Sequence, residues 1–544
     1  MRIIFINPPF NDYKYSRSQR SPGVISSGTM YYPYWLAHCA ALVEQAGHHI
    51  YLLDCPADDI SRERMVSVIA QFKADVAVME SSTASIEYDL ATVAFAKQRF
   101  DARYVMVGTH VTAEWEQTLA DNRQLSYIAI GEYDQTVVDL LSALENKAAV
   151  SGVPALAYRE DGMVKRGPFR APIENMDLLP WIAPIYKRFL KPRNYRFTIA
   201  TYPMLMLIGG RGCKAKCFYC VYPQVMHGHR YRTRSPAHLV GEMLWIQENM
   251  PEIREIVFED DTFTADREWA REVARLKKAR GVTLPFFANI RTNIDRETLQ
   301  ALKDAGLREC ATGFESGDET LLVNMRKGQT LEQQRKFMDI ARELDLLVHG
   351  CFMVGFPGET RQSLQKTYDL AVKLNPDSAQ FYPVMPYPGT GAYQWAKDSN
   401  MLATDKFSDW LNEDGSHRCV INLPGLDAVE LDEFCRKATA RFHLRSRYIY
   451  KKVIQAIRFP REGIRSIGAF ISFISKPKKK LKSSNSFWPK GELANDIVVD
   501  TEVVKVPVGR MERVERIIKR KTITLNQYKE NSEMLIKAER DSER

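Results

Sequence analysis

Short apolar runs alternate with amphipathic stretches over the first 150 residues. We predict strands in the apolar runs 2–6, 49–54, 74–80, 104–108 and 127–131. The stretches between and after them have apolar residues at helical spacing, at 34–47, 62–72, 88–100 and 135–145. Strands that are regularly separated by helices indicate a parallel sheet covered on both faces, so residues 1–150 are expected to form a doubly wound, Rossmann-like α/β domain.

Small, polar and turn-forming residues follow the predicted strands of this domain. They are Asn7 to Phe10, Ser81 to Thr83, Gly108 to His110 and Gly131 to Asp134. In open parallel sheets, ligands bind beyond the carboxyl ends of the strands. We therefore expect a ligand site at this edge.

A second series of strands and helices follows a linker at residues 151–200 that is rich in Pro and polar groups. Its strands are predicted at 204–210, 255–260, 285–290, 309–316, 348–355 and 379–385, and helical stretches follow the first five. This pattern predicts a partial TIM-type (βα)6 barrel over residues 201–400, in which the loops after the strands build the site.

Composition narrows the class of protein without fixing its function. The chain has 544 residues, of which 45% are hydrophobic and 26% charged, as in globular proteins of two to four domains. No secretory signal precedes the first strand, and no run approaches the ~20 apolar residues of a membrane-spanning helix. We expect a cytoplasmic protein, and its odd number of nine cysteines argues against a disulfide framework.

Three of the cysteines lie close together in the glycine-rich stretch GGRGCKAKCFYCVYPQ. Cys213, Cys217 and Cys220 are spaced so that one loop can wrap an iron-sulfur cluster. A 4Fe-4S cube takes four ligands, so three cysteines leave one iron open for a small chelating molecule. A zinc site completed by His227 or His229, or purely structural cysteines, are the alternatives.

This motif resembles the signature of the radical S-adenosylmethionine (radical SAM) superfamily, with Tyr219 as the aromatic residue before the third cysteine. The resemblance implies that the three cysteines hold the catalytic cluster, which cleaves S-adenosylmethionine to a 5'-deoxyadenosyl radical. Later strand-end motifs match the family in order. The resemblance implies S-adenosylmethionine contacts at Tyr219 and, in these motifs, at Asp260 and Asp261, Arg291, Glu315 and Ser316, and Val354 and Gly355. Taken singly, such residues are also common as helix caps and in turns.

The first domain resembles the cobalamin-binding domain that precedes the radical core in one subclass. The resemblance implies cobalamin contacts at Asn7, Pro8, Ser81, Ser82, Thr83, Gly108, His110, Gly131 and Glu132. The loop after the first strand contains no histidine, and the first histidine of the chain is His38 on a predicted helix. We therefore expect the cobalt to lack a protein histidine ligand. A domain that kept the fold and lost the ligand is the other interpretation.

The two domains together predict cobalamin-dependent C-methylation of an unactivated carbon on a lipid-like or secondary-metabolite substrate. An anaerobic oxidative cyclase of a tetrapyrrole is the alternative, and a non-catalytic cobalamin or iron-sulfur sensor is another. A transfer-RNA methylthiotransferase would need three more cysteines in the first domain, which has only Cys39 and Cys55. We expect a flavodoxin- or ferredoxin-type electron donor as partner.

The C-terminal part is expected to be helical and basic over residues 401–482. Residues 436–482 contain fifteen Lys or Arg and one acid, Glu462, and carry apolar residues such as Ile464 and Ile467 at helical spacing. This pattern favours contact with an anionic membrane surface over nucleic acid. A helix packed on the barrel with its charges in water is the other interpretation. The final segment, 483–544, is expected to be a loosely ordered tail.

Overall fold

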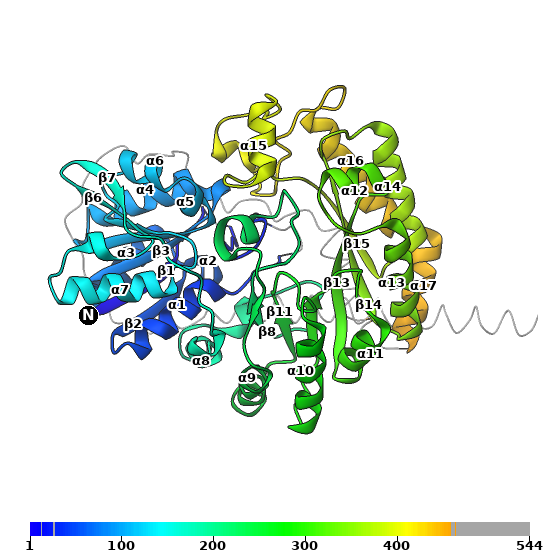
Figure 1. Cartoon of the computed structure of the whole chain (residues 1–544), viewed down its shortest axis with the longest axis horizontal. Coiled ribbons are helices and arrows are strands. Elements are labelled where there is room, and N and C mark those ends of the chain that lie inside the picture. Colours follow the sequence, from blue (N-terminus) through cyan, green and yellow to red (C-terminus); the bar gives the residue numbers. More distant parts are fainter. Residues whose placement is uncertain (12, 25–27, 459–462, 464–544) are drawn as a thin grey trace, which may run out of the picture. The chain divides into compact units, whose positions relative to one another are not determined.

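The first sheet of the computed structural model contains all five strands predicted in the N-terminal domain (Figure 1). They run parallel in the order β2-β1-β3-β4-β5. Their bounds are β1 (Arg2–Asn7), β2 (His49–Asp54), β3 (Val76–Ser81), β4 (Arg103–Gly108) and β5 (Tyr127–Ala129). The structure describes the chain except residues 12, 25–27, 459–462 and 464–544.

Helices cover both faces of this sheet because each strand alternates its side chains between two cores. Ile3 and Phe5 of β1 join the core under α1 and α7, whereas Ile4 and Ile6 join the core under α3 and α4. The helices are α1 (Tyr34–Gln45), α2 (Cys55–Asp58), α3 (Arg62–Phe72), α4 (Ile86–Lys97), α5 (Thr109–Ala113), α6 (Trp115–Asp121) and α7 (Asp134–Glu145). The doubly wound prediction is confirmed.

The segment expected to be a linker contains two further strands of the first sheet. β6 (Leu156–Glu160) pairs antiparallel with β5, and β7 (Met163–Arg166) pairs antiparallel with β6. The sheet therefore has seven strands and extends beyond residue 150. A short helix, α8 (Ala183–Phe189), leads from it toward the second sheet.

The second sheet is the predicted partial barrel, with six parallel strands in sequential order. They are β8 (Met204–Leu207), β11 (Glu255–Phe258), β12 (Phe286–Asn289), β13 (Leu307–Glu315), β14 (Leu347–Val354) and β15 (Ser378–Pro383). The helices beside them are α9 (Pro236–Asn249), α10 (Arg267–Ala279), α11 (Arg296–Asp304), α12 (Glu319–Asn324), α13 (Leu331–Glu343) and α14 (Arg361–Leu374). The carboxyl ends of all six strands thus meet at one edge.

Local sequence signals set the bounds of these helices. Asp266 and Asp295 accept backbone N–H groups at the starts of α10 and α11, and Thr330 and Thr360 form capping boxes at the starts of α13 and α14. In α10 the buried positions recur at helical spacing, at Trp269, Ala270, Val273, Ala274 and Lys277.

The predicted helical C-terminal region is only partly helical: residues 399–427 form turns, isolated bridges and one short 3-10 turn, and α-helix returns at residue 428. The helices are α15 (Gly391–Asp398), α16 (Ala428–His443) and α17 (Ser446–Arg458). Most of the predicted basic segment after Arg458, with its isoleucines at 464 and 467, and the tail 483–544 lie outside the described residues. Among the described helices, none is long and apolar enough to cross a bilayer.

Candidate active site

The cysteine loop lies at the carboxyl end of the first barrel strand, β8. A two-stranded hairpin of β9 (Gly210–Arg211) and β10 (Arg232–Thr233) brackets it. Cys213 and Cys217 are buried and Cys220 is half-buried. Gly212 has a φ of +89°, and a Cβ there would lie 2.2 Å from the carbonyl oxygen of Arg230. Only glycine therefore allows the chain to enter the loop on this path.

Two side chains hold the backbone of the loop. Gln224 Nε2 lies 3.2 Å, 2.9 Å and 2.9 Å from the carbonyl oxygens of Cys217, Phe218 and Cys220. His229 Nδ1 lies 3.2 Å from the carbonyl oxygen of Cys213 and 2.9 Å from that of Ala215. These contacts fix the loop without using the thiols, which stay available as ligands.

The donor set of the loop fits an iron-sulfur cluster. Burial raises the pKa of Cys220 well above its usual value, so this thiol is neutral until a metal takes the place of its proton. His229 is turned to the loop backbone, and His227 Nδ1 lies 3.2 Å from Glu132 Oε1. The two histidines considered for zinc therefore have other partners. Among the described residues, no three His, Cys, Asp or Glu side chains are placed to hold a single metal ion.

Glu315 brings a free carboxylate oxygen to the same edge of the barrel. Its Oε1 accepts hydrogen bonds from Tyr219 Oη at 3.1 Å and from Lys327 Nζ at 2.6 Å. Its Oε2 is buried and has no partner among the described residues. A buried, unpartnered acceptor fits a ligand that donates hydroxyl or ammonium hydrogens, as S-adenosylmethionine does.

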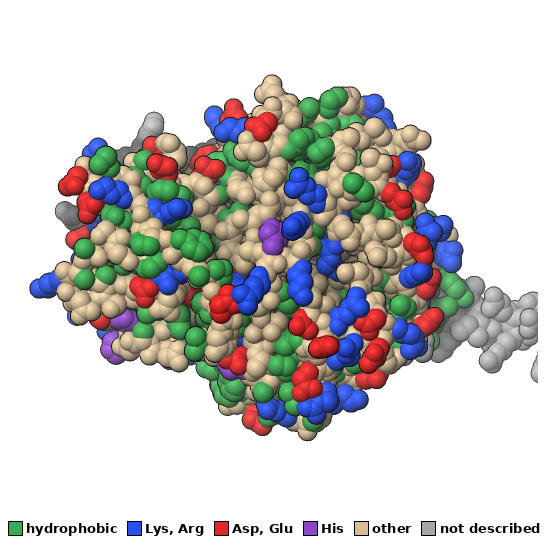
Figure 2. Space-filling view, viewed as in Figure 1, with side chains coloured by type: hydrophobic (Ala, Val, Ile, Leu, Met, Phe, Trp, Pro, Cys, Tyr) green, Lys and Arg blue, Asp and Glu red, His purple; other side chains and the backbone are tan. Residues whose placement is uncertain are grey.

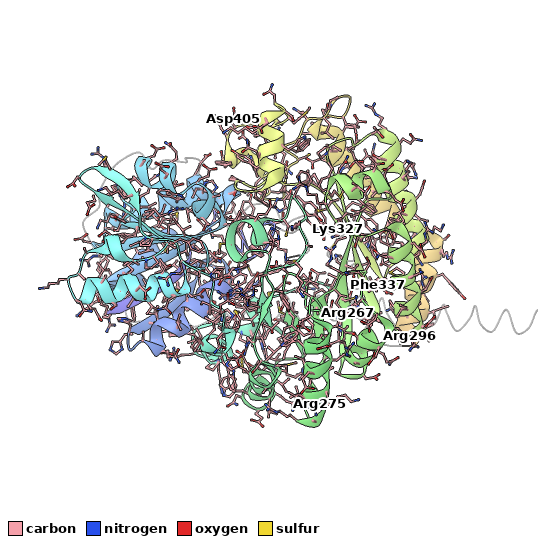
Figure 3. The ribbon with its side chains drawn as sticks, in the orientation of Figure 1. Arg267, Arg275, Arg296, Lys327, Phe337 and Asp405 are labelled. Carbon is pink, nitrogen blue, oxygen red and sulfur yellow. The ribbon has the colours of Figure 1, made fainter. Side chains whose placement is uncertain are left out.

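Arg291 links this carboxylate group to the cysteine loop. Its Nη1 donates to Cys217 Sγ at 3.8 Å, and its Nη2 donates to the carbonyl oxygen of Lys327. Figure 3 shows Lys327 in the interior of the view, whereas Arg275 lies at the rim. Lys327 was not predicted as a site residue. Its only signal is a pair of basic residues, Arg326 and Lys327, in the turn after α12, and such residues are common on surfaces.

Asp260 and Asp261 make their contacts within the chain. Asp260 accepts from the backbone N–H of Gly209 at 2.8 Å and from Tyr231 Oη at 3.1 Å, and burial raises its pKa to about 7. Asp261 Oδ1 lies 3.4 Å from Nη2 of Arg20. Asp260 thus ties β11 to the entrance of the cysteine loop.

Ser316, Val354 and Gly355 lie at the ends of β13 and β14. Ser316 Oγ lies 3.2 Å from Thr367 Oγ1 and accepts from the N–H of Asp318 at 3.1 Å. Val354 is buried, and Gly355 donates its N–H to Glu359 Oε2 at 3.2 Å. Of the residues predicted to contact S-adenosylmethionine, Tyr219, Arg291 and Glu315 therefore lie together beside the cysteines, whereas Asp260 and Ser316 have internal partners.

In the first domain, the chain itself fills the crevice between the ends of β1 and β3. Arg17 donates through Nη1 to Asn7 Oδ1 at 2.8 Å and to the carbonyl oxygen of Pro8 at 2.6 Å, and it forms a buried ion pair with Asp89. Ser82 Oγ lies 2.9 Å from Tyr15 Oη. Asn7, Pro8 and Ser82 therefore have partners from Tyr15 and Arg17 in the segment after β1, two residues that were not predicted as contacts.

The ends of β3, β4 and β5 form a small, neutral lining. Gly108 has a φ of +118°, and a Cβ there would lie 2.3 Å from the carbonyl oxygen of Ser81. His110 Nδ1 lies 3.3 Å from Thr83 Oγ1, and burial lowers the pKa of His110 to about 3, so its ring is neutral. Gly131 also has positive φ, at +69°. Small residues around an uncharged ring fit the flat, neutral benzimidazole tail of cobalamin.

Glu132 faces the cysteine loop. Its carboxylate forms ion pairs with Arg232 and Arg211 of the β9–β10 hairpin. Ser81 also bonds internally, with Oγ donating to the carbonyl oxygen of Val107 at 3.0 Å. Within the predicted cobalamin set, Thr83, Gly108, His110 and Gly131 therefore lie together at the ends of β3, β4 and β5, and Glu132 connects this edge to the barrel.

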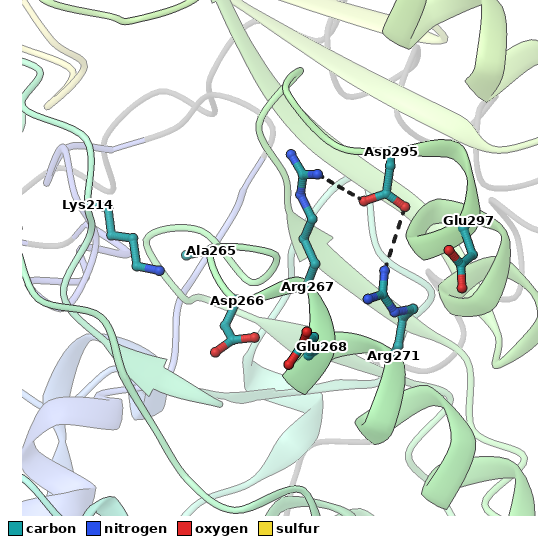
Figure 4. Close-up of a pocket in the computed structure, with 8 residues that line it drawn as sticks. All are labelled: Lys214, Ala265, Asp266, Arg267, Glu268, Arg271, Asp295 and Glu297. Atoms are coloured by element: carbon teal, nitrogen blue, oxygen red, sulfur yellow. Dashed lines mark ion pairs between the residues drawn. The ribbon is translucent and has the colours of Figure 1, made fainter.

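A charged hollow of about 640 Å³ lies beside the cysteine loop. Figure 4 shows Lys214 of that loop on one side, and on the other Asp295, which pairs with Arg267 at 3.3 Å and Arg271 at 3.8 Å. The hollow is lined by charged side chains, so it suits a polar partner and not an apolar substrate.

The barrel, its three-cysteine loop and the preceding doubly wound domain have the architecture of a radical SAM enzyme with an N-terminal cobalamin-binding domain, and family models identify both domains in this chain. Residues 207–371 match the model of the Radical SAM superfamily, and residues 20–141 match that of the B12 binding domain. The predicted cofactors, a 4Fe-4S cluster, S-adenosylmethionine and cobalamin, are those of these two domains. Their individual contact residues stay predictions.

Relatives and solved structures agree with this assignment. The chain is 29% identical to an uncharacterized methyltransferase of Pyrococcus horikoshii (PH0819), over 84% of this chain and 95% of the relative. It is 26% identical to the anaerobic magnesium-protoporphyrin IX monomethyl ester cyclase of Rubrivivax gelatinosus, over 72% and 70%. The structure of the radical SAM methyltransferase TsrM from Kitasatospora setae, with cobalamin and a [4Fe-4S] cluster bound, superposes with a TM-score of 0.62 at 16% identity, covering 81% and 88%. At that identity the likeness concerns the fold.

Proposed function

We propose that this protein is a cobalamin-dependent radical SAM methyltransferase that methylates an unactivated carbon of a small molecule. The observation that carries the proposal is the meeting of the three-cysteine loop with the unpartnered carboxylate oxygen of Glu315 at one barrel edge. When bound, the cluster would supply the electron that cleaves S-adenosylmethionine, and cobalamin would carry the methyl group.

The protein's own residues position the reactants. Cys213, Cys217 and Cys220 would hold the cluster and leave one iron open. Glu315 would accept hydrogens of S-adenosylmethionine through Oε2, while Lys327 and Tyr219 fix its other oxygen. Aromatic rings pack beside the loop: the ring centroid of Phe356 lies 5.9 Å from that of Phe218 and 5.3 Å from that of Tyr219. These rings would exclude water from the radical.

Anaerobic reconstitution with iron, sulfide and cobalamin, followed by S-adenosylmethionine and a strong reductant, tests this function. We expect 5'-deoxyadenosine and, for methyl transfer, S-adenosylhomocysteine. Cys217→Ala should abolish the cluster and both products, whereas Cys419→Ala, at a buried cysteine without a predicted ligand role, should keep them. Failure to form 5'-deoxyadenosine with an intact cluster would contradict the proposal.

The tetrapyrrole cyclase alternative is retained because a cyclase is among the relatives. A cyclase of that type would form 5'-deoxyadenosine without S-adenosylhomocysteine. The ratio of the two products during turnover with candidate substrates therefore separates the two functions.

A reduced flavodoxin or ferredoxin is proposed as the electron donor. Lys214, Lys216 and Arg326 are exposed, and no ion pair engages them among the described residues. The backbone N–H of Phe218 donates to the carbonyl oxygen of Met325 at 3.2 Å, which brings Arg326 next to the cysteine loop. Figure 2 shows Lys and Arg side chains gathered in the middle of the face in view. An acidic carrier would be attracted to such a surface.

Charge reversal tests this partner. Lys216→Glu with Arg326→Glu should weaken binding of flavodoxin about tenfold and flatten its dependence on salt. Arg275→Glu with Lys278→Glu, at exposed positions of α10, serves as the matched control. Equal affinities of the two variants would contradict this surface.

Helix α17 is proposed as a peripheral membrane contact. Four of its apolar side chains face outward, with Ile449 46%, Tyr450 68%, Val453 51% and Ile457 75% exposed. Its Lys451 Nζ instead faces the barrel, 3.0 Å from Asp377 Oδ1. An exposed apolar stripe next to a strongly basic segment is suited to an anionic bilayer. A lipid-like substrate would be consistent with that location.

Co-sedimentation with vesicles tests this contact. Phosphatidylglycerol vesicles should bind the full chain, and phosphatidylcholine vesicles should not. Replacing Ile449, Val453 and Ile457 by Ser should release the protein without changing the yield of 5'-deoxyadenosine. Binding that is unchanged in this variant, or a stripe that proves to mediate dimers in light scattering, would contradict the proposal.

A further inference from the structure

Glu132 joins the loop after β5 to the hairpin that brackets the cysteine loop. Its side chain is 4% exposed. Oε2 accepts from Arg232 Nη1 at 3.0 Å and lies 3.7 Å from Arg211 Nη1, and Oε1 lies 3.2 Å from His227 Nδ1. Asp134 completes the group by accepting from Arg211 Nη1 at 2.6 Å. One carboxylate of the first domain thus contacts three residues of the barrel.

These three residues lie at the two ends of the cysteine loop. Arg211 stands two residues before Cys213, and Arg232 pairs with it across the β9–β10 hairpin. The N–H of Cys213 donates to the carbonyl oxygen of Gly228 at 3.3 Å, next to His227. Because Arg211, Arg232 and Glu132 are buried, moving one charge away from the others is costly. The hairpin therefore has to follow Glu132.

The loop after β5 is also bonded to the end of β4 in the first domain. The N–H of Gly131 donates to Thr112 Oγ1 at 3.0 Å, and Thr112 Oγ1 donates to the carbonyl oxygen of Gly108 at 2.8 Å. A continuous series of buried and half-buried contacts runs from Gly108 through Thr112 and Glu132 to Arg211. It connects the ends of β4 and β5 with the entrance of the cysteine loop.

We propose that Glu132 is a positioning residue through which binding at the ends of β4 and β5, beside Gly108 and Gly131, alters the environment of the cysteine loop. This inference rests on the proposed function, in which cobalamin binds at this edge of the first domain. A group inserted between the ends of β4 and β5 displaces Gly131. The bonded neighbour Glu132 then moves Arg211 and Arg232, and with them the backbone at Cys213.

The reconstituted full-length protein tests this coupling through the spectrum and potential of its cluster. We expect bound hydroxocobalamin to shift the electron paramagnetic resonance signal and the midpoint potential of the cluster. Glu132→Gln, loaded with the cluster and measured at a saturating concentration of cobalamin, should lose at least half of that cobalamin-dependent shift. Because it leaves an excess positive charge beside the loop, the same variant should also move the potential of the cobalamin-free protein to more positive values.

Asp139→Asn is the matched control, since it removes an ion pair with Arg170 in the same domain and lies outside the network. Asp139→Asn should keep the full shift. If Glu132→Gln does not fold, Arg232→Lys is tested in its place, because lysine keeps the positive charge but cannot form the bidentate contact with Glu132. A full shift in either network variant, or no shift in the natural protein with cobalamin bound, would overturn the inference. Absence of cobalamin binding would instead contradict the proposed function.

Discussion

Single residues at the barrel edge combine charge with restricted geometry. Glu315 has a φ of +61°, a conformation that residues other than glycine seldom adopt. Its carboxylate is buried, yet only one of its two oxygens has partners among the described residues. Such a strained and half-satisfied residue persists only where the surrounding structure holds it, which is typical of binding sites.

We predict that Glu315→Gln lowers the affinity for S-adenosylmethionine at least tenfold, which corresponds to about 1.4 kcal/mol. The amide keeps the shape of the side chain but loses the charge that Lys327 and the ligand share. Equilibrium binding to the reconstituted protein measures the change. Glu343→Gln, at an exposed ion pair with Arg296, should leave the affinity unaltered, and equal losses in both variants would contradict the prediction.

Buried carboxyl groups also make stability depend on pH. Burial raises the pKa of Glu80 to about 8, even though Ser18 Oγ donates to it at 2.8 Å. The folded chain then holds a proton that the unfolded chain releases near its ordinary pKa of about 4.3. The free energy of unfolding should therefore fall as pH rises from about 4.3 to 8, by up to ~1.4 kcal/mol per pH unit from this group.

Glu80→Gln should flatten this dependence, since the amide stays neutral at every pH. Urea unfolding between pH 5 and 8 checks it, with Asp101→Asn at an exposed position as the control. A slope that is the same in Glu80→Gln and in the natural protein would show that another group causes it.

At the scale of elements, the fold followed from hydrophobic periodicity. Each of the eleven predicted strands is present, because buried parallel strands are short and almost wholly apolar, as in β3 and β11. β7 was not predicted because its sequence is largely polar and its side chains are partly exposed at the edge of the sheet. Site residues can be predicted where they form a local pattern in the sequence, as Cys213, Cys217 and Cys220 do. Lys327 contacts Glu315 only through the tertiary fold, so no local pattern indicated it.

The close approach of β3 and β4 gives a prediction at this scale. Gly108→Ala should destabilise the protein by about 2–4 kcal/mol and weaken cobalamin binding, because its Cβ would lie 2.3 Å from the carbonyl oxygen of Ser81. Gly47 also has positive φ, at +92°, but has open space around it, so Gly47→Ala isolates the backbone strain. Thermal unfolding and cobalamin titration compare the two. Equal effects would contradict a role for the close approach.

At the scale of the whole chain, the segment after β1 connects the first domain to the barrel. Arg20 donates through Nη1 to Glu259 Oε2 at 3.0 Å and through Nη2 to the carbonyl oxygen of Glu259 at 2.9 Å. Tyr222 Oη donates to the carbonyl oxygen of Ser18 at 3.0 Å. The sequence could not predict these contacts, since they join residues more than 200 positions apart, as the separation of 239 for Arg20 and Glu259 shows.

Arg20→Met should lower the free energy of unfolding by about 2–4 kcal/mol, because Glu259 and Asp261 would then face each other without a cation. Adding Glu259→Gln to this variant should restore part of the loss, since it removes one of the two uncompensated charges. Urea unfolding of the two single variants and the double variant measures the coupling. Losses that simply add would mean that the arginine acts through packing on Tyr222, whose ring lies 5.6 Å from its guanidinium, and not through charge.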